Sequence, residues 1–329
     1  MIELNPFDAL RQIAGGYCVA RCLHVIADLG VADFLDETPQ TAASLASSVG
    51  AHPDALMRIL RLLSAYGVFE FQEDKFLHSP ASRLLRTDHP HSMRSFVRMF
   101  GLPINWQAYG EFGYSARTGL PAVERVNPNG FWGYLVEHPE ANAIFNQAMT
   151  AKSHAQVAGI TAAYDFSGSK LIGDIGGGRG HLLCSILDRV PMAKGVLFDQ
   201  PHVIEEVSSL ASERLALQAG DFFTDDLPVC DTYVLMEVIH GWGDDESVAI
   251  LNTIRRAAPT GAKLLVIETI LPDDPGPDWS KMLDIHMLTL PGGKQRTLTE
   301  YKALFGKSGF SFEREIDTGA GISILETAV

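Results

Sequence analysis

The sequence predicts an α/β protein in which a doubly wound, Rossmann-like sheet of seven strands follows a smaller, mainly helical N-terminal domain. Three observations lead to this prediction. Seven short β-rich runs alternate with helical patterns from residue 170 onward, as in a parallel sheet with crossover helices. A glycine-rich turn follows the first of these runs, at the edge where such sheets bind ligands. The first hundred residues show the order helix, turn, helix and hairpin, which is typical of a winged helix.

Composition sets limits on the partners of the chain. Its 329 residues are enough for two domains, and a hydrophobic content of 46% is ordinary for a globular protein. The net charge of −14 disfavours nucleic acid, because that affinity depends on Lys and Arg contacts to phosphate. No apolar run reaches the roughly 18 residues of a membrane-spanning helix, and the N-terminus lacks a signal-peptide pattern. We therefore expect a cytoplasmic protein without a nucleic-acid or membrane partner.

The cysteines predict no metal site. Cys18, Cys22, Cys184 and Cys230 form no C-x-x-C pair. Cys18 and Cys22 would share a helix face, but two thiols without a neighbouring His are more often packing residues. We therefore expect neither a bound metal nor a redox motif.

Residues 1–100 are predicted to form a winged-helix dimerisation domain. Apolar residues at helical spacing predict one long or two short helices over residues 6–35, with a break at Gly30. The other predicted elements are two helices and two short strands, at 41–49, 54–66, 68–72 and 75–78. Such a module either binds DNA or serves as a scaffold for dimerisation or for closing a pocket. The scaffold is favoured, because these residues include nine Lys or Arg against eleven Asp or Glu.

Residues 101–164 are predicted to form a helical connector that lines the substrate pocket. The helical pattern is interrupted by Pro103, Gly110, Gly113, Gly119, Pro121, Pro128 and Gly130. Aromatic residues lie among these helix breakers. This combination is more typical of a pocket lining than of a regular helical bundle.

Residues 165–329 are predicted to form the sheet domain. The seven predicted strands are residues 171–175, 196–198, 215–219, 232–237, 263–268, 310–316 and 321–326. A short turn that contains glycine separates the last two runs. We therefore expect these two to form an antiparallel hairpin at one edge of the sheet.

The turn after the first predicted strand has the sequence DIGGGRG, from Asp174 to Gly180. Glycine lets a ligand approach the backbone, and the following helix offers unpaired N–H groups. A dinucleotide fingerprint would need a glycine at the position of His181, and no G-K-[ST] follows for a phosphate-binding loop. A tight turn would explain the glycines equally well, so this motif alone identifies no ligand.

Acidic residues lie at the ends of three successive predicted strands. Asp174 and Asp199 close the first two, and Asp199 lies where an acidic residue reaches a ribose hydroxyl in such sheets. Asp221 and Phe222 follow the third strand and offer an acceptor beside an apolar face, which would suit adenine. A single acidic strand end is commonly a helix cap. Three of them at one sheet edge are explained more simply by one nucleoside-like ligand.

His240 and Glu268 lie at the ends of the fourth and fifth predicted strands. A lone His is usually structural, but this one lies just beyond a strand's carboxyl end and precedes the aromatic Trp242. Glu268 ends its strand in the same layer. A carboxylate that accepts from one imidazole nitrogen fixes the tautomer and leaves the other nitrogen free to act as a base.

The chain resembles the plant caffeic acid O-methyltransferase-like family, and its bacterial relatives that act on aromatic natural products, in six motifs that occur in order: DIGGGRG, FDQPHVIEE, GDFF, VIHGWGDDES, VIETILP and PGGKQRT. The resemblance covers nearly the whole chain, because the N-terminal module also looks like that family's dimerisation domain. It implies S-adenosylmethionine as cofactor, a small aromatic acceptor and a homodimer. Residues 1–35 are expected to interleave with the second subunit.

The resemblance also implies roles for individual residues. His240 matches the general base, and Glu268 matches the first of two acidic residues that flank it. The positions that match cofactor contacts are Gly176 and Gly178 in the loop, Asp199 at the ribose, Asp221 and Phe222 at the adenine, and Trp242 near the cofactor. The positions that match the clamp on the aromatic acceptor are Phe145, Met149 and Met287.

Three positions depart from the family's pattern. Gln295 stands where the family often has the second acidic residue, Gly241 where it often has Asp, and Met236 where it has Lys. Gln295 can still form hydrogen bonds but supplies no charge, so stabilisation of a charged His240 would fall on Glu268. Gln295 is therefore predicted as a catalytic residue that acts without charge.

The sequence leads to the hypothesis of an O-methyltransferase in which His240 takes the proton of a phenolic hydroxyl. One alternative is a family member that binds S-adenosylmethionine but catalyses hydroxylation, decarboxylation or a pericyclic step. Another is a winged-helix regulator that senses a small molecule, which the acidic charge disfavours. The sequence names neither the acceptor nor the position that is methylated.

Overall fold

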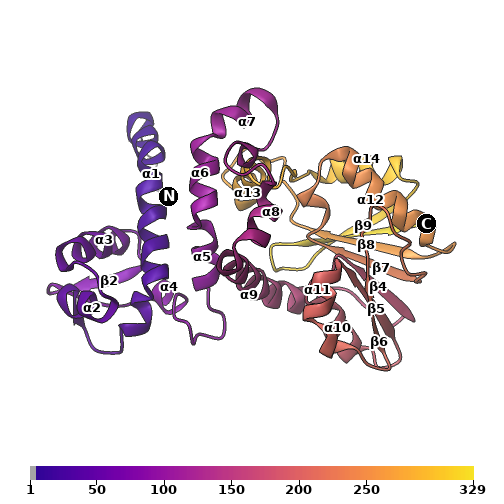
Figure 1. The fold of residues 1–329 in the computed structure, drawn as a ribbon, viewed down its shortest axis with the longest axis horizontal. Coiled ribbons are helices and arrows are strands. Elements are labelled where there is room, and N and C mark those ends of the chain that lie inside the picture. Colours follow the sequence, from indigo (N-terminus) through magenta and orange to yellow (C-terminus); the bar gives the residue numbers. More distant parts are fainter. Residues whose placement is uncertain (1–4) are drawn as a thin grey trace. The chain divides into compact units, whose positions relative to one another are not determined.

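The computed structural model describes residues 5–329, which form two compact units (Figure 1). One unit extends to Trp106 and also contains Tyr134–Lys152, and the other consists of Gln107–Gly133 and Ser153–Val329. The domain boundaries at residues 100 and 164 stay predictions. Residues 1–4 of the segment that was expected to interleave with a second subunit lie outside the described residues.

The first unit begins with one long helix, α1 (Pro6–Leu29). Its N-terminus is capped by Asn5, whose side chain accepts from the backbone N–H of Asp8 at 3.0 Å. Its C-terminus is at Gly30, which has a left-handed φ of 68°. The single helix is therefore the correct one of the two predicted arrangements. The following elements are η1 (Val31–Phe34), β1 (Gln40–Thr41), α2 (Ala42–Val49), α3 (Pro53–Ala65), β2 (Phe69–Gln72), β3 (Lys75–His78), α4 (Pro80–Arg83) and α5 (Arg94–Phe100).

The predicted helices and hairpin of the winged helix are present. The strands β2 and β3 form the hairpin, and β1 pairs with β3 to give the order β1-β3-β2. The sequence pattern missed β1, because a strand of two residues shows no alternation. The core of this unit includes Ile26 of α1, Leu60 of α3 and Phe76 of β3, all fully buried.

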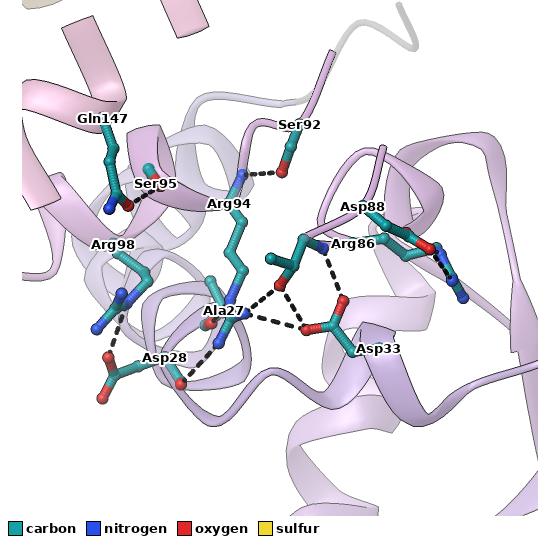
Figure 2. A network of polar contacts seen from close by, with 11 residues as sticks. Ala27, Asp28, Asp33, Arg86, Asp88, Ser92, Arg94, Ser95, Arg98 and Gln147 are labelled. Carbon is teal, nitrogen blue, oxygen red and sulfur yellow. Dashed lines mark hydrogen bonds and ion pairs between the residues drawn. The ribbon is translucent and has the colours of Figure 1, made fainter. Parts of the chain in front are cut away.

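Arg94 connects the end of α1 to the start of α5 (Figure 2). Its guanidinium donates to the carbonyl oxygens of Ala27 and Asp28 at 2.8 and 3.3 Å. It also donates to the Asp33 carboxylate at 3.0 Å and to the hydroxyl of Thr87. The last carbonyls of a helix lack partners within the helix, so a cation here stabilises the end of α1.

The second unit contains the predicted seven-stranded sheet. Its strands are β4 (Leu171–Ile175), β5 (Lys194–Asp199), β6 (Leu215–Ala219), β7 (Thr232–Met236), β8 (Lys263–Glu268), β9 (Ser311–Asp317) and β10 (Ser323–Ala328). The strand order is β6-β5-β4-β7-β8-β10-β9. The strands β4 to β8 are parallel, and β10 runs antiparallel between β8 and β9, which confirms the predicted edge hairpin. The strand order reverses between β4 and β7, and ligands bind at such switch points.

Helices cover both faces of this sheet. The helices from residue 103 onward are α6 (Pro103–Gly110), α7 (Phe112–Thr118), η2 (Ala122–Arg125), α8 (Gly130–Glu137), α9 (Pro139–Ala163), α10 (His181–Arg189), α11 (Pro201–Glu206), η3 (Ser208–Leu210), η4 (Ile239–Gly241), α12 (Asp244–Ala257), α13 (Trp279–Thr289) and α14 (Leu298–Lys307). One buried cluster includes Ile250 of α12 and Phe305 of α14, and a second includes Ile160 of α9 and Ile186 of α10. Six of the seven predicted helix breakers between residues 103 and 130 lie at helix ends or between helices, whereas Gly113 lies within α7.

Glu326 on β10 forms a buried polar centre in the sheet. Its side chain is 1% exposed and accepts from the Tyr164 hydroxyl at 2.8 Å, Lys263 Nζ at 2.7 Å and Arg314 Nε at 2.6 Å. Burial alone would raise the pKa of this carboxyl. The hydrogen bonds from Lys263, Arg314 and Tyr164 outweigh burial and lower the pKa of Glu326 to about 2.

Replacing Glu326 by Gln should therefore destabilise the fold at neutral pH. A carboxyl with a lowered folded-state pKa stabilises the fold above its unfolded pKa, and this contribution is lost as pH falls from 4.5 towards 2. We expect the free energy of unfolding to fall by about 2 kcal/mol. The loss is no larger because Lys263 and Arg314 are about half exposed, and water weakens their ion pairs with Glu326. Denaturant unfolding at pH 7 and pH 3 measures this. The exposed Glu315 on β9 provides the control, since Glu315→Gln should change stability by less than about 0.5 kcal/mol. Equal effects of the two variants would contradict the account.

Candidate active site

A glycine turn joins the end of β4 to the start of α10. Gly176, Gly178 and Gly180 have φ of 68°, 57° and 71°, in the left-handed region that favours glycine. A Cβ atom at Gly177 would lie 2.4 Å from Cγ of Asp174, so the turn passes directly over the Asp174 carboxyl group. The predicted glycine loop is thus a closely packed turn whose conformation requires glycine.

Asp174 lies beneath this turn as a buried acceptor. The residue is 1% exposed, and neither carboxylate oxygen has a hydrogen-bond partner of good geometry, although the backbone N–H of Leu183 lies close enough to oppose the rise in its pKa. Burial, and then the charge of Asp199, raise the pKa of Asp174 to about 7. A buried unpaired carboxylate is costly, so a cationic or N–H-donating ligand that reached it would stabilise the charged form.

Asp199 at the end of β5 is held against the same turn. Its Oδ2 accepts from the backbone N–H of Gly178 at 2.7 Å, and its Oδ1 accepts from that of Gln200 at 2.7 Å. Burial raises the pKa of Asp199 although both hydrogen bonds oppose it. The structure therefore brings together Asp174, the glycine turn and Asp199.

Aromatic side chains gather after β6 and β7. Phe222 lies edge to face with Trp242, with 5.9 Å between the ring centroids. The sequence predicted that both residues lie near the cofactor. Phe223, which was not among the predicted site residues, lies closer to Trp242, at 4.8 Å between ring centroids. The Asp221 carboxylate accepts from the Phe223 backbone N–H at 2.9 Å. One of its two oxygens therefore stabilises the turn that contains it.

The predicted pair of His240 and Glu268 is formed. His240 Nδ1 lies 2.7 Å from Glu268 Oε2, and the His240 backbone N–H donates to Glu268 Oε1 at 3.2 Å. The Glu268 side chain is fully buried, and the His240 side chain is 13% exposed. A carboxylate can only accept, so Nδ1 carries the proton and Nε2 is left with a lone pair. The arrangement can take a proton from a hydroxyl group at Nε2.

The segment after α13 lies against His240. The backbone N–H of Lys294 donates to the carbonyl of His240 at 2.9 Å, and the backbone N–H of Gln295 donates to Asp284 of α13 at 2.9 Å. The side chain of Gln295 is fully buried, and neither its amide oxygen nor its amide nitrogen has a partner. The uncharged residue at this position thus retains both a donor and an acceptor.

Sequence reasoning missed two further residues of this site. Glu237, just before η4, has a φ of 55°, which is rare for a residue other than glycine and marks a turn held by its surroundings. Arg296 is fully buried and bonds to both ends of η4. The motif PGGKQRT contains Arg296, but no spacing rule relates it to η4, which lies far away in the sequence.

The predicted clamp on the acceptor is divided between the two units. Met287 lies on α13 in the unit that contains His240. Phe145 and Met149 lie on the part of α9 that belongs to the other unit. The meeting of these three side chains at one acceptor stays a prediction.

Among residues 5–329, no group of three or more His, Cys, Asp or Glu is arranged to hold a metal ion. Over the same residues, no helix is long and apolar enough to cross a membrane.

Comparison with known proteins gives matches over almost the whole chain. A family model described as an O-methyltransferase domain matches residues 111–311, and one described as an O-methyltransferase dimerisation domain matches residues 11–88. The phenazine O-methyltransferase PhzM of Lysobacter antibioticus is 39% identical over 96% of this chain and 94% of its own. The mitomycin biosynthesis 6-O-methyltransferase of Streptomyces lavendulae is 36% identical over 97% and 93%.

A solved structure with the same fold contains ligands. It is the O-methyltransferase NcsB1 from neocarzinostatin biosynthesis, in complex with S-adenosyl-L-homocysteine and 1,4-dihydroxy-2-naphthoic acid. The two structures have a TM-score of 0.79 and 31% sequence identity, over 95% of this chain and 96% of that one.

Proposed function

This chain belongs to the caffeic acid O-methyltransferase-like family of S-adenosylmethionine-dependent O-methyltransferases, and we propose that it methylates a hydroxyl group on a small aromatic natural product, with His240 as the general base. The observation that supports the role of His240 is its 2.7 Å hydrogen bond to buried Glu268 at the carboxyl edge of the parallel sheet. The non-methylating alternative has no support among the relatives named above, which are all methyltransferases.

The residues at the edge of β4 to β6 are suited to the cofactor. Its ammonium group would be held by Asp174, whose two oxygens lack protein partners. Its ribose hydroxyls would donate to Asp199, which the Gly178 backbone already orients. Its adenine would lie among the aromatic rings of Phe222, Phe223 and Trp242, with Asp221 as an acceptor. When bound, S-adenosylmethionine supplies an electrophilic methyl group on a sulfonium centre.

His240 removes the proton that makes the acceptor hydroxyl a poor nucleophile. A phenol has a pKa near 10 in water, so almost none of it is ionised at neutral pH. Nε2 accepts this proton while Glu268 accepts from Nδ1–H and stabilises the imidazolium that forms. Such a base contributes about 10²- to 10⁴-fold to the rate.

Gln295 orients the acceptor without adding charge. Its buried amide has a free donor and a free acceptor, and buried amides are rarely left unpaired. A hydroxyl, carbonyl or carboxylate substituent beside the reacting hydroxyl would satisfy the amide. A carboxylate at this position would repel an anionic acceptor, so the neutral amide favours acceptors with an acidic or carbonyl substituent.

The acceptor class comes from the relatives. Their names specify a phenazine, mitomycin and a dihydroxynaphthoic acid, which are all small ring systems with polar substituents. We propose that Phe145, Met149 and Met287 hold such a ring. The planar ring of Phe145 and the flexible thioethers of the two Met side chains suit a planar aromatic ligand.

The chain acts as a homodimer through α1. Four large apolar side chains at helical spacing lie on one face of this helix and are between 63% and 77% exposed: Phe7, Leu10, Ile13 and Tyr17. A stripe of this kind on a free monomer would be a liability, and such stripes mark interfaces. The dimerisation-domain match over residues 11–88 supports a second copy of the chain as the partner.

Asp174→Asn should weaken binding of S-adenosylmethionine by about 10- to 100-fold, since a charged hydrogen bond of about 1.5–3 kcal/mol is lost. The pKa of Asp174 near 7 in the unliganded protein predicts a second effect, a dependence of affinity on pH. The fraction of Asp174 that is charged decreases as pH falls below 7, so the affinity of the wild type for S-adenosylmethionine should drop about tenfold from pH 8 to pH 6. Asp174→Asn should not show this drop. Calorimetric titration measures both. The exposed Asp188→Asn variant should bind like the wild type, and an Asp174→Asn variant that did so would overturn the assignment.

His240→Ala should lower kcat by about 10²- to 10⁴-fold and leave the affinity for S-adenosylmethionine within about twofold. Formation of S-adenosylhomocysteine, followed by mass spectrometry with a panel of hydroxylated phenazines, quinones and naphthoates, measures the turnover. His91→Ala, which removes an exposed imidazole of the first unit, should leave turnover unchanged. Turnover of His240→Ala within about threefold of wild type would exclude His240 as the base.

A double variant, Leu10→Asp with Ile13→Asp, should convert the dimer to a monomer, because charges in an apolar interface are not solvated. Sedimentation at micromolar concentration should give the mass of two 35.8 kDa chains for the wild type and of one for the variant. Met192→Asp replaces an exposed apolar side chain of the other unit and should remain dimeric. A wild-type protein that sediments as one chain would contradict this proposal.

A further inference from the structure

We propose that Arg296 is the positioning residue that fixes the backbone of His240, an inference that rests on the proposed role of His240 as the base. The guanidinium of Arg296 is fully buried, although Arg is among the residues least often found there. A buried cation is retained only where its hydrogen bonds are satisfied, so its partners indicate what it holds in place.

The guanidinium bonds to both ends of the single turn that contains the base. Nη1 donates to the carbonyl of Ile239 at 3.2 Å, and Nη2 donates to that of Trp242 at 2.9 Å. These residues enclose His240 in η4, which has only three residues. So short a 3₁₀ turn has little stability of its own, so its conformation depends on outside contacts.

Arg296 also holds the segment that packs against His240 from the other side. Its Nη1 donates to the Lys294 carbonyl at 3.2 Å, and the Lys294 N–H donates to the His240 carbonyl at 2.9 Å. Gly293 approaches still more closely, because a Cβ atom there would lie 2.0 Å from the His240 carbonyl oxygen. The His240 backbone is therefore enclosed between Glu268 and the segment 293–296.

Asp244 balances the charge of the buried cation. Its Oδ1 accepts from Arg296 Nε at 3.0 Å and from Nη2 at 2.8 Å, at the first residue of α12. The hydrogen bond from Arg296 is the main cause of the lowered pKa of Asp244. The planar guanidinium group of Arg296 thus links η4, α12 and the segment after α13. Lys could replace it only in part, because an ammonium group lacks the fixed planar arrangement of donors.

A positioning role for Arg296 and a purely structural role predict different effects when Arg296 is replaced. The ring of His240 is oriented by Glu268, but the position of the ring depends on the backbone of η4. A displacement of about 1 Å in a catalytic group can cost up to about 100-fold in rate. Loss of Arg296 should therefore affect the proton-transfer step. Asp174 and Asp199 form no hydrogen bond with Arg296 and should still bind the cofactor.

The experiment compares Arg296→Met and Arg296→Lys with the wild-type dimer. We expect Arg296→Met to lower kcat by about 10- to 100-fold with KM for S-adenosylmethionine within about twofold, and Arg296→Lys to recover only part of this loss. In protein labelled with ¹⁵N-histidine, the Nδ1–H signal of His240, assigned by its absence in His240→Gln, should shift or broaden in Arg296→Met. Arg189→Met removes another Arg that bonds to a backbone carbonyl, that of Thr161, and should change neither readout.

Two results would overturn the proposal: a folded Arg296→Met variant with kcat within about twofold of wild type, or an unchanged His240 signal. If Arg296→Met does not fold, Asp244→Asn provides the test. This variant weakens the hydrogen bonds between Arg296 and residue 244, so it should shift the same His240 signal and lower kcat. If His240→Ala shows that His240 is not the base, the histidine signal still tests whether Arg296 positions this residue. The failure of one proposal is therefore distinguishable from the failure of the other.

Discussion

The hydrogen bond between the Glu268 carboxylate and the His240 imidazole is the interaction on which the rest of the site depends. A fully buried carboxylate is stable only when donors surround it, and the imidazole and backbone N–H of His240 provide two. Neighbouring parallel strands β7 and β8 end side by side, which brings the two residues together from positions far apart in the sequence. This pairing fixes the tautomer in which the lone pair lies on Nε2, the atom proposed to take the acceptor's proton.

The two halves of the parallel sheet present different side chains at their carboxyl edge. The edge formed by β4, β5 and β6 presents an unpaired carboxylate under a glycine turn, a second carboxylate and a group of aromatic rings. The edge formed by β7 and β8 presents the imidazole and its buried partner. The strand order reverses between β4 and β7, so the residues proposed to bind the cofactor and the residue proposed as the base lie at one switch point. A methyl donor and a proton acceptor can thus act on the same hydroxyl group.

Sequence patterns predicted what depends on local order and missed what depends on packing. The bounds of β4, β6 and β8 were predicted without error, because each is an apolar run closed by a polar or glycine residue. Asp174, Asp199 and His240 were proposed as site residues from their places at strand ends, and the structure places them at the carboxyl edge of the sheet. Arg296 and Phe223 were missed, because only the folded chain brings the guanidinium to η4 and the ring to Trp242. The clamp of Phe145, Met149 and Met287 rests on resemblance alone, since its members lie on two units.

The central claim is that His240 ionises the acceptor within the site, and the dependence of rate on the acceptor's own pKa tests it most directly. The measurement uses a series of substituted phenolic acceptors whose pKa values span about 7 to 10, at saturating S-adenosylmethionine and neutral pH. The account predicts a shallow dependence for the wild type. It predicts that the rate of His240→Gln follows the ionised fraction of each acceptor, about tenfold per pKa unit. An equally steep dependence in both proteins would contradict the claim.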